Sequence, residues 1–312
     1  MHAIAKIISR RIGRNLGRAM SVDFRVDTVD RLGPDEFFEQ FVHPRRPVVI
    51  SGAMKDCALC SLWSLDYLTR RSGDRIVHLK EWDGSEIKVK VARLGEYIDV
   101  LRDYESRGDD ADRRPAYLHD VPLTSIVPDA PSGLDSLSAY FPAWYRTLWP
   151  KFAQLFLGPT GSVTPLHFDC LLTHNLFFQV VGAKRFTMVP YEQAKYCYRN
   201  NWRWFEVDVE QPDYERHPLY RLATPVQVIV GPGDMLYIPP GTLHHVRSLD
   251  CALSFNVDWH TKGSALAGLI AGMRGMPGKN VYYNAIIAFG LWSGVSAEAL
   301  LPYYRSYLNY VS

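Results

Sequence analysis

The chain has 312 residues, of which 47% are hydrophobic and 22% are charged, and its net charge is +2. This composition is typical of a globular protein with a sizeable core, and the small net charge excludes a strongly basic chain for which nucleic acid is a required partner. The five cysteines are an odd number and scattered, which favours a reducing compartment, so we expect the protein in the cytoplasm and without a disulfide framework.

Residues 1–22 predict a basic amphipathic extension, because isoleucines recur at helical spacing and no acidic residue interrupts the segment. Its basic residues are Lys6, Arg10, Arg11, Arg14 and Arg18. Such a segment is compatible with organellar targeting if the source is eukaryotic, with a membrane-surface helix, with a partner-binding helix or with a solvated extension. No run of apolar residues is long enough to predict a transmembrane segment.

Residues 23–114 predict an α/β region that packs on a larger core. Its turn residues and apolar periodicity predict helices over 34–42, 63–73 and 94–108 and strands over 47–52, 75–82 and 85–94. Cys57 and Cys60 form a CxxC pair, but no second pair completes a zinc site. The charged stretch 108–114 predicts a surface loop and a boundary.

Residues 115–260 read as strand, turn, strand, with no long helix between the strands. Short segments rich in β-forming residues cover 115–121, 153–159, 173–181, 184–189, 225–239, 244–249 and 252–260. Gly-Pro and Pro-Gly turns separate several of them. The pattern predicts a mainly β fold with flanking helices, its core an antiparallel barrel or jelly roll. Residues 261–312 become helical and very apolar, which predicts a C-terminal helical tail that packs on the barrel or forms a homodimer.

His167 and Asp169 are two residues apart in a predicted strand, so their side chains share a face about 7 Å apart along it. Such a pair alone is more often hydrogen-bonded than metal-bound. His244 offers a third ligand, because it shares parity with Val246 and should point into the barrel, whereas His245 should face solvent. Two histidines and one carboxylate leave open coordination positions and suit non-haem Fe(II) that activates O₂.

Lys184 shares parity with Phe186 and Met188, so it is expected on the apolar face of its strand. A buried ammonium must meet an anion or lose its proton, unless the side chain extends to the barrel rim. One anion that fits is the distal carboxylate of a cosubstrate such as 2-oxoglutarate, whose other end would chelate the iron.

Three stretches carry a family resemblance: TPLHFD, HNLFFQVVGAKRF and GPGDMLYIPPGTLHHV. They resemble the JmjC, or cupin-8, family of Fe(II)- and 2-oxoglutarate-dependent oxygenases, in particular the asparaginyl hydroxylase that inhibits hypoxia-inducible factor and its bacterial cupin-like relatives. The resemblance covers about residues 37–260. It implies a double-stranded β-helix, the jelly roll of cupins, as the core.

The resemblance also implies roles for individual residues. His167, Asp169 and His244 would be the catalytic metal ligands for Fe(II). The residues expected to bind 2-oxoglutarate are Tyr117, Thr164 and Lys184 at its distal carboxylate, and Asn175 and Asn256 beside its iron-bound end. Trp259 lies one residue away from the position of a family tryptophan, so no role is carried over to it.

The chain departs from the asparaginyl hydroxylase after Asp169, where Cys170, Leu171 and Leu172 replace polar residues that contact the peptide there. An asparagine peptide is therefore not the expected substrate. We expect hydroxylation of a C–H bond in a protein side chain or an amino-acid-like substrate, with release of succinate and CO₂. The alternatives are hydroxylation of a small-molecule metabolite, demethylation, a cupin metalloenzyme that does not use 2-oxoglutarate, and a non-catalytic barrel that serves as an interaction module.

Overall fold

The computed structural model describes residues 24–57, 62–83, 86–108, 111–272, 275–296, 298–300 and 302–303. The predicted basic extension and Cys60 lie outside these residues. So do most of the residues between 297 and 310 in the predicted helical tail.

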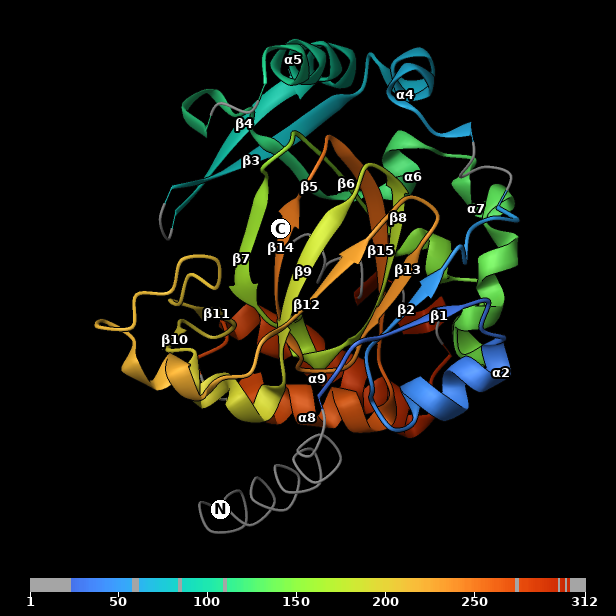
Figure 1. Cartoon of the computed structure of the whole chain (residues 1–312). Coiled ribbons are helices and arrows are strands. Elements are labelled where there is room, and N and C mark those ends of the chain that lie inside the picture. The colour runs from blue at the N-terminus through green and yellow to red at the C-terminus, as the bar shows by residue number, and fades with distance from the viewer. Residues whose placement is uncertain are drawn as a thin grey trace.

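Two β-sheets face each other and form the core of the molecule (Figure 1). The nine-stranded sheet has the order β1 (Asp27–Asp30), β2 (Val48–Ser51), β13 (Met235–Ile238), β8 (His174–Val181), β15 (Ala252–Trp259), β6 (Gln154–Gly158), β5 (Tyr117–Pro122), β3 (Ile76–Asp83) and β4 (Glu86–Arg93). The six-stranded sheet has the order β10 (Arg199–Asn200), β11 (Trp204–Phe205), β7 (Val163–His167), β14 (Leu243–Ser248), β9 (Lys184–Val189) and β12 (Val226–Val230).

Successive strands from β6 to β9, and again from β12 to β15, alternate between the two sheets. This winding is that of a jelly roll, and it confirms the predicted mainly β class with flanking helices. The described strand pairs are antiparallel except β1 and β2, which pair in parallel. Strands β1 to β4 join the nine-stranded sheet, so the N-terminal region shares a sheet with the barrel. The domain boundaries at residues 114 and 260 stay predictions.

The predicted N-terminal helices form, with shifted ends. They are α2 (Pro34–Phe37), continued by a π-helical turn over Phe38–Val42, α4 (Leu65–Ser72) and α5 (Leu94–Arg107). Helix α4 begins where it does because the Ser64 side chain accepts a hydrogen bond from the Tyr67 N–H at 3.1 Å. The sequence did not predict the short helices α6 (Leu123–Ile126) and α7 (Ala130–Gly133).

The main hydrophobic core lies on one face of the nine-stranded sheet. On β15 the alternate residues Phe255, Val257 and Trp259 are fully buried in this core. The ring of Phe255 stacks on Phe178 with centroids 4.6 Å apart. The intervening residues of β15 are polar and face the six-stranded sheet, so strand alternation leaves a polar interior between the sheets.

Helices α8 (Lys262–Gly272) and α9 (Gly278–Ser293) lie across one end of the barrel (Figure 1). Neither they nor the other described helices are both long and apolar enough to cross a membrane. Tyr282, Phe289 and Trp292 of α9 are exposed. Dimerisation through these helices stays a prediction.

Candidate active site

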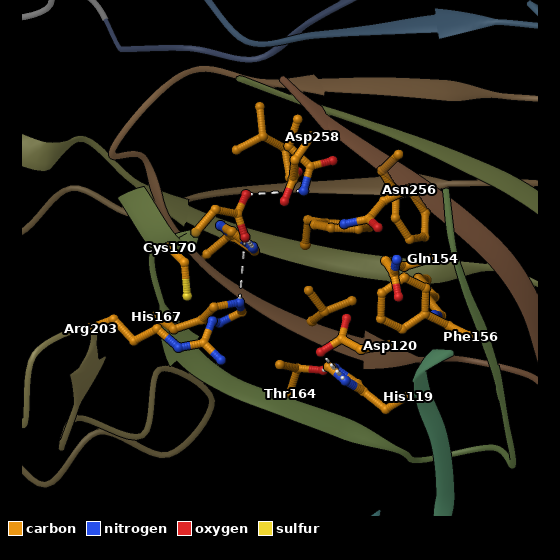
Figure 2. Close-up of a pocket in the computed structure, with 18 of the residues that line it drawn as sticks. His119, Asp120, Gln154, Phe156, Thr164, His167, Cys170, Arg203, Asn256 and Asp258 are labelled. Carbon is orange, nitrogen blue, oxygen red and sulfur yellow. Dashed lines mark hydrogen bonds and ion pairs between the residues drawn. The ribbon is translucent and has the colours of Figure 1, made fainter. Parts of the chain in front are cut away.

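A pocket lies between the two sheets, and every predicted site residue lines it. These residues are Tyr117, Thr164, His167, Asp169, Asn175, Lys184, His244 and Asn256. Figure 2 labels three of them, Thr164, His167 and Asn256. The eight residues come from six strands and one loop, and several of these elements are far apart in the sequence. The structure therefore brings the predicted set together in space.

The three predicted metal ligands meet where β7 and β14 run side by side. His167 is the last residue of β7 and pairs with His244. Asp169 Oδ1 lies 3.9 Å from His167 Nε2 and 3.6 Å from His244 Nε2. The three ligand atoms all lie within 4.8 Å of one another. Because metal–ligand bonds are about 2.0–2.2 Å long, small side-chain shifts would let one ion contact all three.

The hydrogen bonds of both imidazoles leave the correct nitrogen for a metal. His167 Nδ1 donates to the Pro165 carbonyl at 2.8 Å, and His244 Nδ1 donates to the Thr242 carbonyl at 3.1 Å. A carbonyl only accepts, so Nδ1 of each ring carries a proton, and each Nε2 faces Asp169 as the nitrogen available to a metal. Burial, with a further contribution from His244, lowers the pKa of His167 well below its usual value and keeps its ring neutral.

The expectation that Asp169 continues the strand of His167 is wrong. Strand β7 ends at His167, and Asp169 precedes a 3₁₀ turn over Cys170–Leu172. Leu172 adopts a φ of 53°, and α8 packs against this turn. The Asp169 carboxylate nevertheless lies close to both imidazoles, and Asn175 Nδ2 donates a hydrogen bond to its second oxygen at 3.0 Å.

A β-bulge places Thr164 in the same pocket as His167. In a regular strand two residues three positions apart point to opposite faces. Here the register between β7 and β14 shifts between His244 and Val246, which pair with His167 and Thr164. Pro165, which has no N–H, lies in the irregular stretch, where proline is tolerated.

The expectation that His245 faces solvent is also wrong. His245 does not line the pocket, but it is only 5% exposed. Val207, Val209 and Tyr220, from the segment that follows β11, are buried on this outer face of the six-stranded sheet. Glu210 of the same segment accepts hydrogen bonds from arginines of β9 and β14. The alternation of side chains along β14 correctly predicted that His245 points away from the pocket. It did not predict the segment that covers this residue on the outer face.

The ammonium of Lys184 is buried inside the barrel and does not extend to the rim. The residue is 1% exposed, and its Nζ donates to Tyr117 Oη at 2.7 Å and to Ser254 Oγ at 2.9 Å. Burial lowers the pKa of Lys184 to about 7. Within the described part of the chain no carboxylate pairs with this ammonium, so its surroundings fit an anionic ligand better than a closed protein contact.

Two predicted amides present oxygens without a partner among the described residues. Asn175 Oδ1 and Asn256 Oδ1 are both buried and lack a hydrogen bond. Such atoms are costly unless a ligand or water meets them. Trp259, by contrast, is fully buried on the other face of β15 and stacks on His174, with ring centroids 5.0 Å apart.

The pocket also contains polar residues that the sequence analysis did not single out. They are His119, Asp120, Gln154, Arg203, Trp204 and Asp258. Asp258 lies two residues after Asn256, and His119 lies two residues after Tyr117. Because residues two apart in a strand share a face, strand alternation would have predicted that Asp258 and His119 also face the pocket. Arg203 precedes β11 at the end of an irregular segment, and no sequence periodicity predicts that it reaches the pocket (Figure 2).

Comparison with known proteins identifies the family. The family described as a cupin-like domain matches residues 34–265. The chain is 28% identical over 267 residues to the lysine-specific demethylase JMJ30 of Arabidopsis thaliana, which covers 77% of this chain and 56% of that protein. It is 26% identical over 262 residues to the 2-oxoglutarate and iron-dependent oxygenase JMJD4 of Gallus gallus, covering 76% and 60% respectively. The matches therefore span less than two thirds of these two relatives.

A third relative is the tRNA wybutosine-synthesizing protein 5 of Gallus gallus, 24% identical over 257 residues, which cover 75% of this chain and 77% of that protein. The family uses Fe(II), 2-oxoglutarate and O₂, and the residues present here fit all three. Two imidazoles and a carboxylate converge, and among the described residues two amide oxygens lack partners and an ammonium is buried without an anion. The chain belongs to the cupin-like, or JmjC, family of Fe(II)- and 2-oxoglutarate-dependent oxygenases.

Proposed function

We propose that this protein is a 2-oxoglutarate-dependent hydroxylase that acts on a protein side chain or an amino-acid-like substrate. The observation that carries the proposal is the meeting of two features in one pocket: the His167–Asp169–His244 cluster and the buried ammonium of Lys184. When bound, Fe(II) and 2-oxoglutarate supply the chemistry that consumes O₂, releases succinate and CO₂ and hydroxylates a C–H bond.

In this proposal the chain binds and orients the reactants. His167 Nε2, His244 Nε2 and the Asp169 carboxylate hold the metal, and Asn175 fixes the rotation of that carboxylate. Lys184 donates charge-assisted hydrogen bonds to the distal carboxylate of the cosubstrate, together with the hydroxyls of Tyr117 and Thr164. The aromatic rings around Lys184 exclude water from this end, with the Phe156 and Phe177 centroids 5.4 Å and 5.3 Å from Nζ.

Turnover of 2-oxoglutarate tests the proposal directly. The purified chain with Fe(II), ascorbate and labelled 2-oxoglutarate should form succinate slowly even without a substrate, because the cosubstrate site is complete without it. Addition of a substrate should accelerate succinate release and add the mass of one oxygen atom to a protein or peptide. Absence of both succinate and thermal stabilisation by metal plus 2-oxoglutarate would contradict the proposal. An oxygen added only to a small molecule would favour the metabolite hydroxylase.

The affinity for 2-oxoglutarate should depend on pH through Lys184. Burial lowers the pKa of this residue to about 7 when the pocket holds no ligand. A bound carboxylate favours the charged form, so the affinity should be highest below pH 7 and fall above it, by up to about tenfold per pH unit. Anaerobic titration calorimetry between pH 6 and 9 measures this fall. Lys184→Arg keeps its charge over this range and should remove the part of the dependence that comes from Lys184; a flat profile in the wild type would contradict the assignment.

Demethylation is a second candidate, because the Arabidopsis relative is named as a lysine-specific demethylase. Hydroxylation of an N-methyl group yields an unstable product that releases formaldehyde, so both reactions use the same site. Methylated and unmethylated lysine peptides should be compared for formaldehyde and for retained oxygen. Formaldehyde release with loss of the methyl group would favour demethylation over stable hydroxylation.

A further inference from the structure

A β-bulge in β5 turns two consecutive residues into the active-site pocket. Leu118 pairs with Leu157 and Val121 pairs with Leu155, so His119 and Asp120 together oppose the single residue Phe156. Asp120 has a φ of 57°, a left-handed conformation that non-glycine residues rarely adopt. In a regular strand His119 and Asp120 would point to opposite faces, but both line the pocket here (Figure 2).

Ionic and aromatic contacts hold this bulge in place. Asp120 Oδ2 accepts from His119 Nδ1 at 3.0 Å and lies 3.6 Å from Nζ of Lys80, which is itself 7% exposed. The His119 ring packs edge to face on Phe156, with centroids 4.8 Å apart. Burial alone would raise the pKa of Asp120, but His119, with Lys80 and Arg203, lowers it overall, so the carboxylate is ionised.

The orientation of His119 determines what its other nitrogen can do. An ionised carboxylate only accepts, so the ring proton lies on Nδ1. The Nε2 atom faces Thr164 Oγ1 at 3.4 Å, beside Asp120 in Figure 2. Lys80, Asp120, His119 and Thr164 thus form one continuous chain of polar contacts. Neither metal binding nor the Lys184 ammonium requires this chain, and an isolated Thr164 would be free to rotate.

We propose that His119, held by Asp120, is a positioning residue that orients the Thr164 hydroxyl toward the distal carboxylate of the 2-oxo acid. This inference rests on the proposed function, in which Thr164 contacts that carboxylate. While the pocket holds no anion, Nε2 of the neutral His119 ring accepts a hydrogen bond from the Thr164 hydroxyl, which keeps its proton. When the carboxylate enters, Thr164 turns its proton to the new acceptor, and Nε2 takes up a proton from solvent and donates to the Thr164 oxygen. The only covalent bond that forms in the protein is the N–H bond between His119 Nε2 and the proton taken from solvent.

The charges around His119 agree with this exchange. Burial lowers the pKa of His119, Asp120 raises it, and the cations Lys80 and Lys184 lower it. The ring is therefore neutral before the ligand binds. A carboxylate beside Lys184 offsets the effect of that cation and favours the imidazolium, which Asp120 already faces. Tyr117, whose ring centroid lies 5.1 Å from that of His119, stays un-ionised because burial raises its pKa.

A double-mutant cycle in the full-length, Fe(II)-loaded protein tests the inference. Anaerobic calorimetry with 2-oxoglutarate compares the wild type, His119→Leu, Thr164→Val and the double variant. Each single change should raise Kd by about tenfold, the effect expected for one hydrogen bond to a charged group. If His119 acts through Thr164, the double variant should bind about as well as Thr164→Val alone. Additive effects, or an unchanged Kd in either single variant, would overturn the inference.

A conservative variant separates positioning from a role in folding. In His119→Gln the side-chain amide can donate to Thr164 at all pH values, so Kd should stay within about threefold of the wild type. Calorimetry in buffers of different ionisation enthalpy measures the protons taken up when 2-oxoglutarate binds. His119→Gln should take up fewer protons than the wild type, because only the proton of Lys184 is then taken up. In His119→Leu the KM for 2-oxoglutarate in uncoupled succinate formation should rise by about the same factor as the calorimetric Kd.

The same titration distinguishes failure of this inference from failure of the proposed function. If the wild type binds no 2-oxoglutarate, both are wrong. If the wild type binds it and Lys184→Met does not, but the cycle is additive, only the role of His119 is wrong. If His119→Gln binds as poorly as His119→Leu, the ring serves the fold of the bulge rather than Thr164.

Discussion

Replacing Lys184 with methionine should weaken 2-oxoglutarate binding by about 10- to 100-fold, because it removes a charge-assisted contact worth about 1.5–3 kcal/mol. Methionine has a similar length and fits the aromatic surroundings of Phe156 and Phe177. The metal ligands are untouched, so Fe(II) affinity should stay at the wild-type level. Calorimetric Kd values for 2-oxoglutarate and for Fe(II), measured without O₂, check the two parts separately.

The same substitution should change how stability depends on pH. The pKa of Lys184 is lowered from 10.5 to about 7 by burial, so the folded state disfavours the charged ammonium. The resulting cost to the free energy of unfolding is fully present below pH 7 and disappears as pH rises from 7 toward 10.5. Relative to the wild type, Lys184→Met should therefore be most favourable at pH 6 and progressively less so toward pH 10.

Thermal unfolding without 2-oxoglutarate at several pH values measures this difference. Loss of the hydrogen bonds to Tyr117 and Ser254 lowers the stability of the variant by an amount that does not depend on pH over this range. The slope of the difference with pH, rather than its sign at one pH, is therefore the informative quantity. If Lys184→Met binds 2-oxoglutarate as well as the wild type, Lys184 does not bind the cosubstrate. If the difference in stability between the two proteins does not depend on pH, Lys184 is not a buried group with a lowered pKa.

Replacing Asp169 with alanine should abolish Fe(II) binding and succinate formation together. The carboxylate is the only anionic member of the His167–Asp169–His244 cluster. Loss of residues that merely orient metal ligands typically lowers metal affinity by about 10- to 100-fold, so loss of a ligand should exceed that range. The fold should survive, because Asp169 lies in a loop and its removal takes a negative charge away from the buried carboxylate of Asp258.

His245→Ala is the matched control for Asp169→Ala. His245 follows His244 directly, yet it is buried on the outer face of the six-stranded sheet and does not line the pocket. Its removal should leave Fe(II) affinity unchanged while reducing thermal stability, because it opens a cavity beneath the covering segment. Retention of iron by Asp169→Ala, or loss of iron by His245→Ala, would mean that the ligand set is wrong.

The sequence by itself determined the choice of ligands and the class of fold. Strand alternation placed His244 inward and His245 outward, and the β-rich pattern between residues 115 and 260 predicted an antiparallel barrel or jelly roll. These properties are local, because alternation needs only the dihedral angles of one strand. The requirement that a buried ammonium meet an anion is likewise a property of the residue type, and it predicts an anionic ligand for Lys184 from strand parity alone.

Only the tertiary structure decided how these residues meet. The bulge at Pro165 brings Thr164 beside His167, and the bulge at His119–Asp120 adds a pair that alternation would have separated. The turn after β7, held by α8, carries Asp169 to His244 although the strand has ended. The burial of His245 depends on a segment that begins dozens of residues earlier in the chain. Bulges, turns and covering segments arise from contacts between distant parts of the chain. The periodicity of a single segment does not predict those contacts.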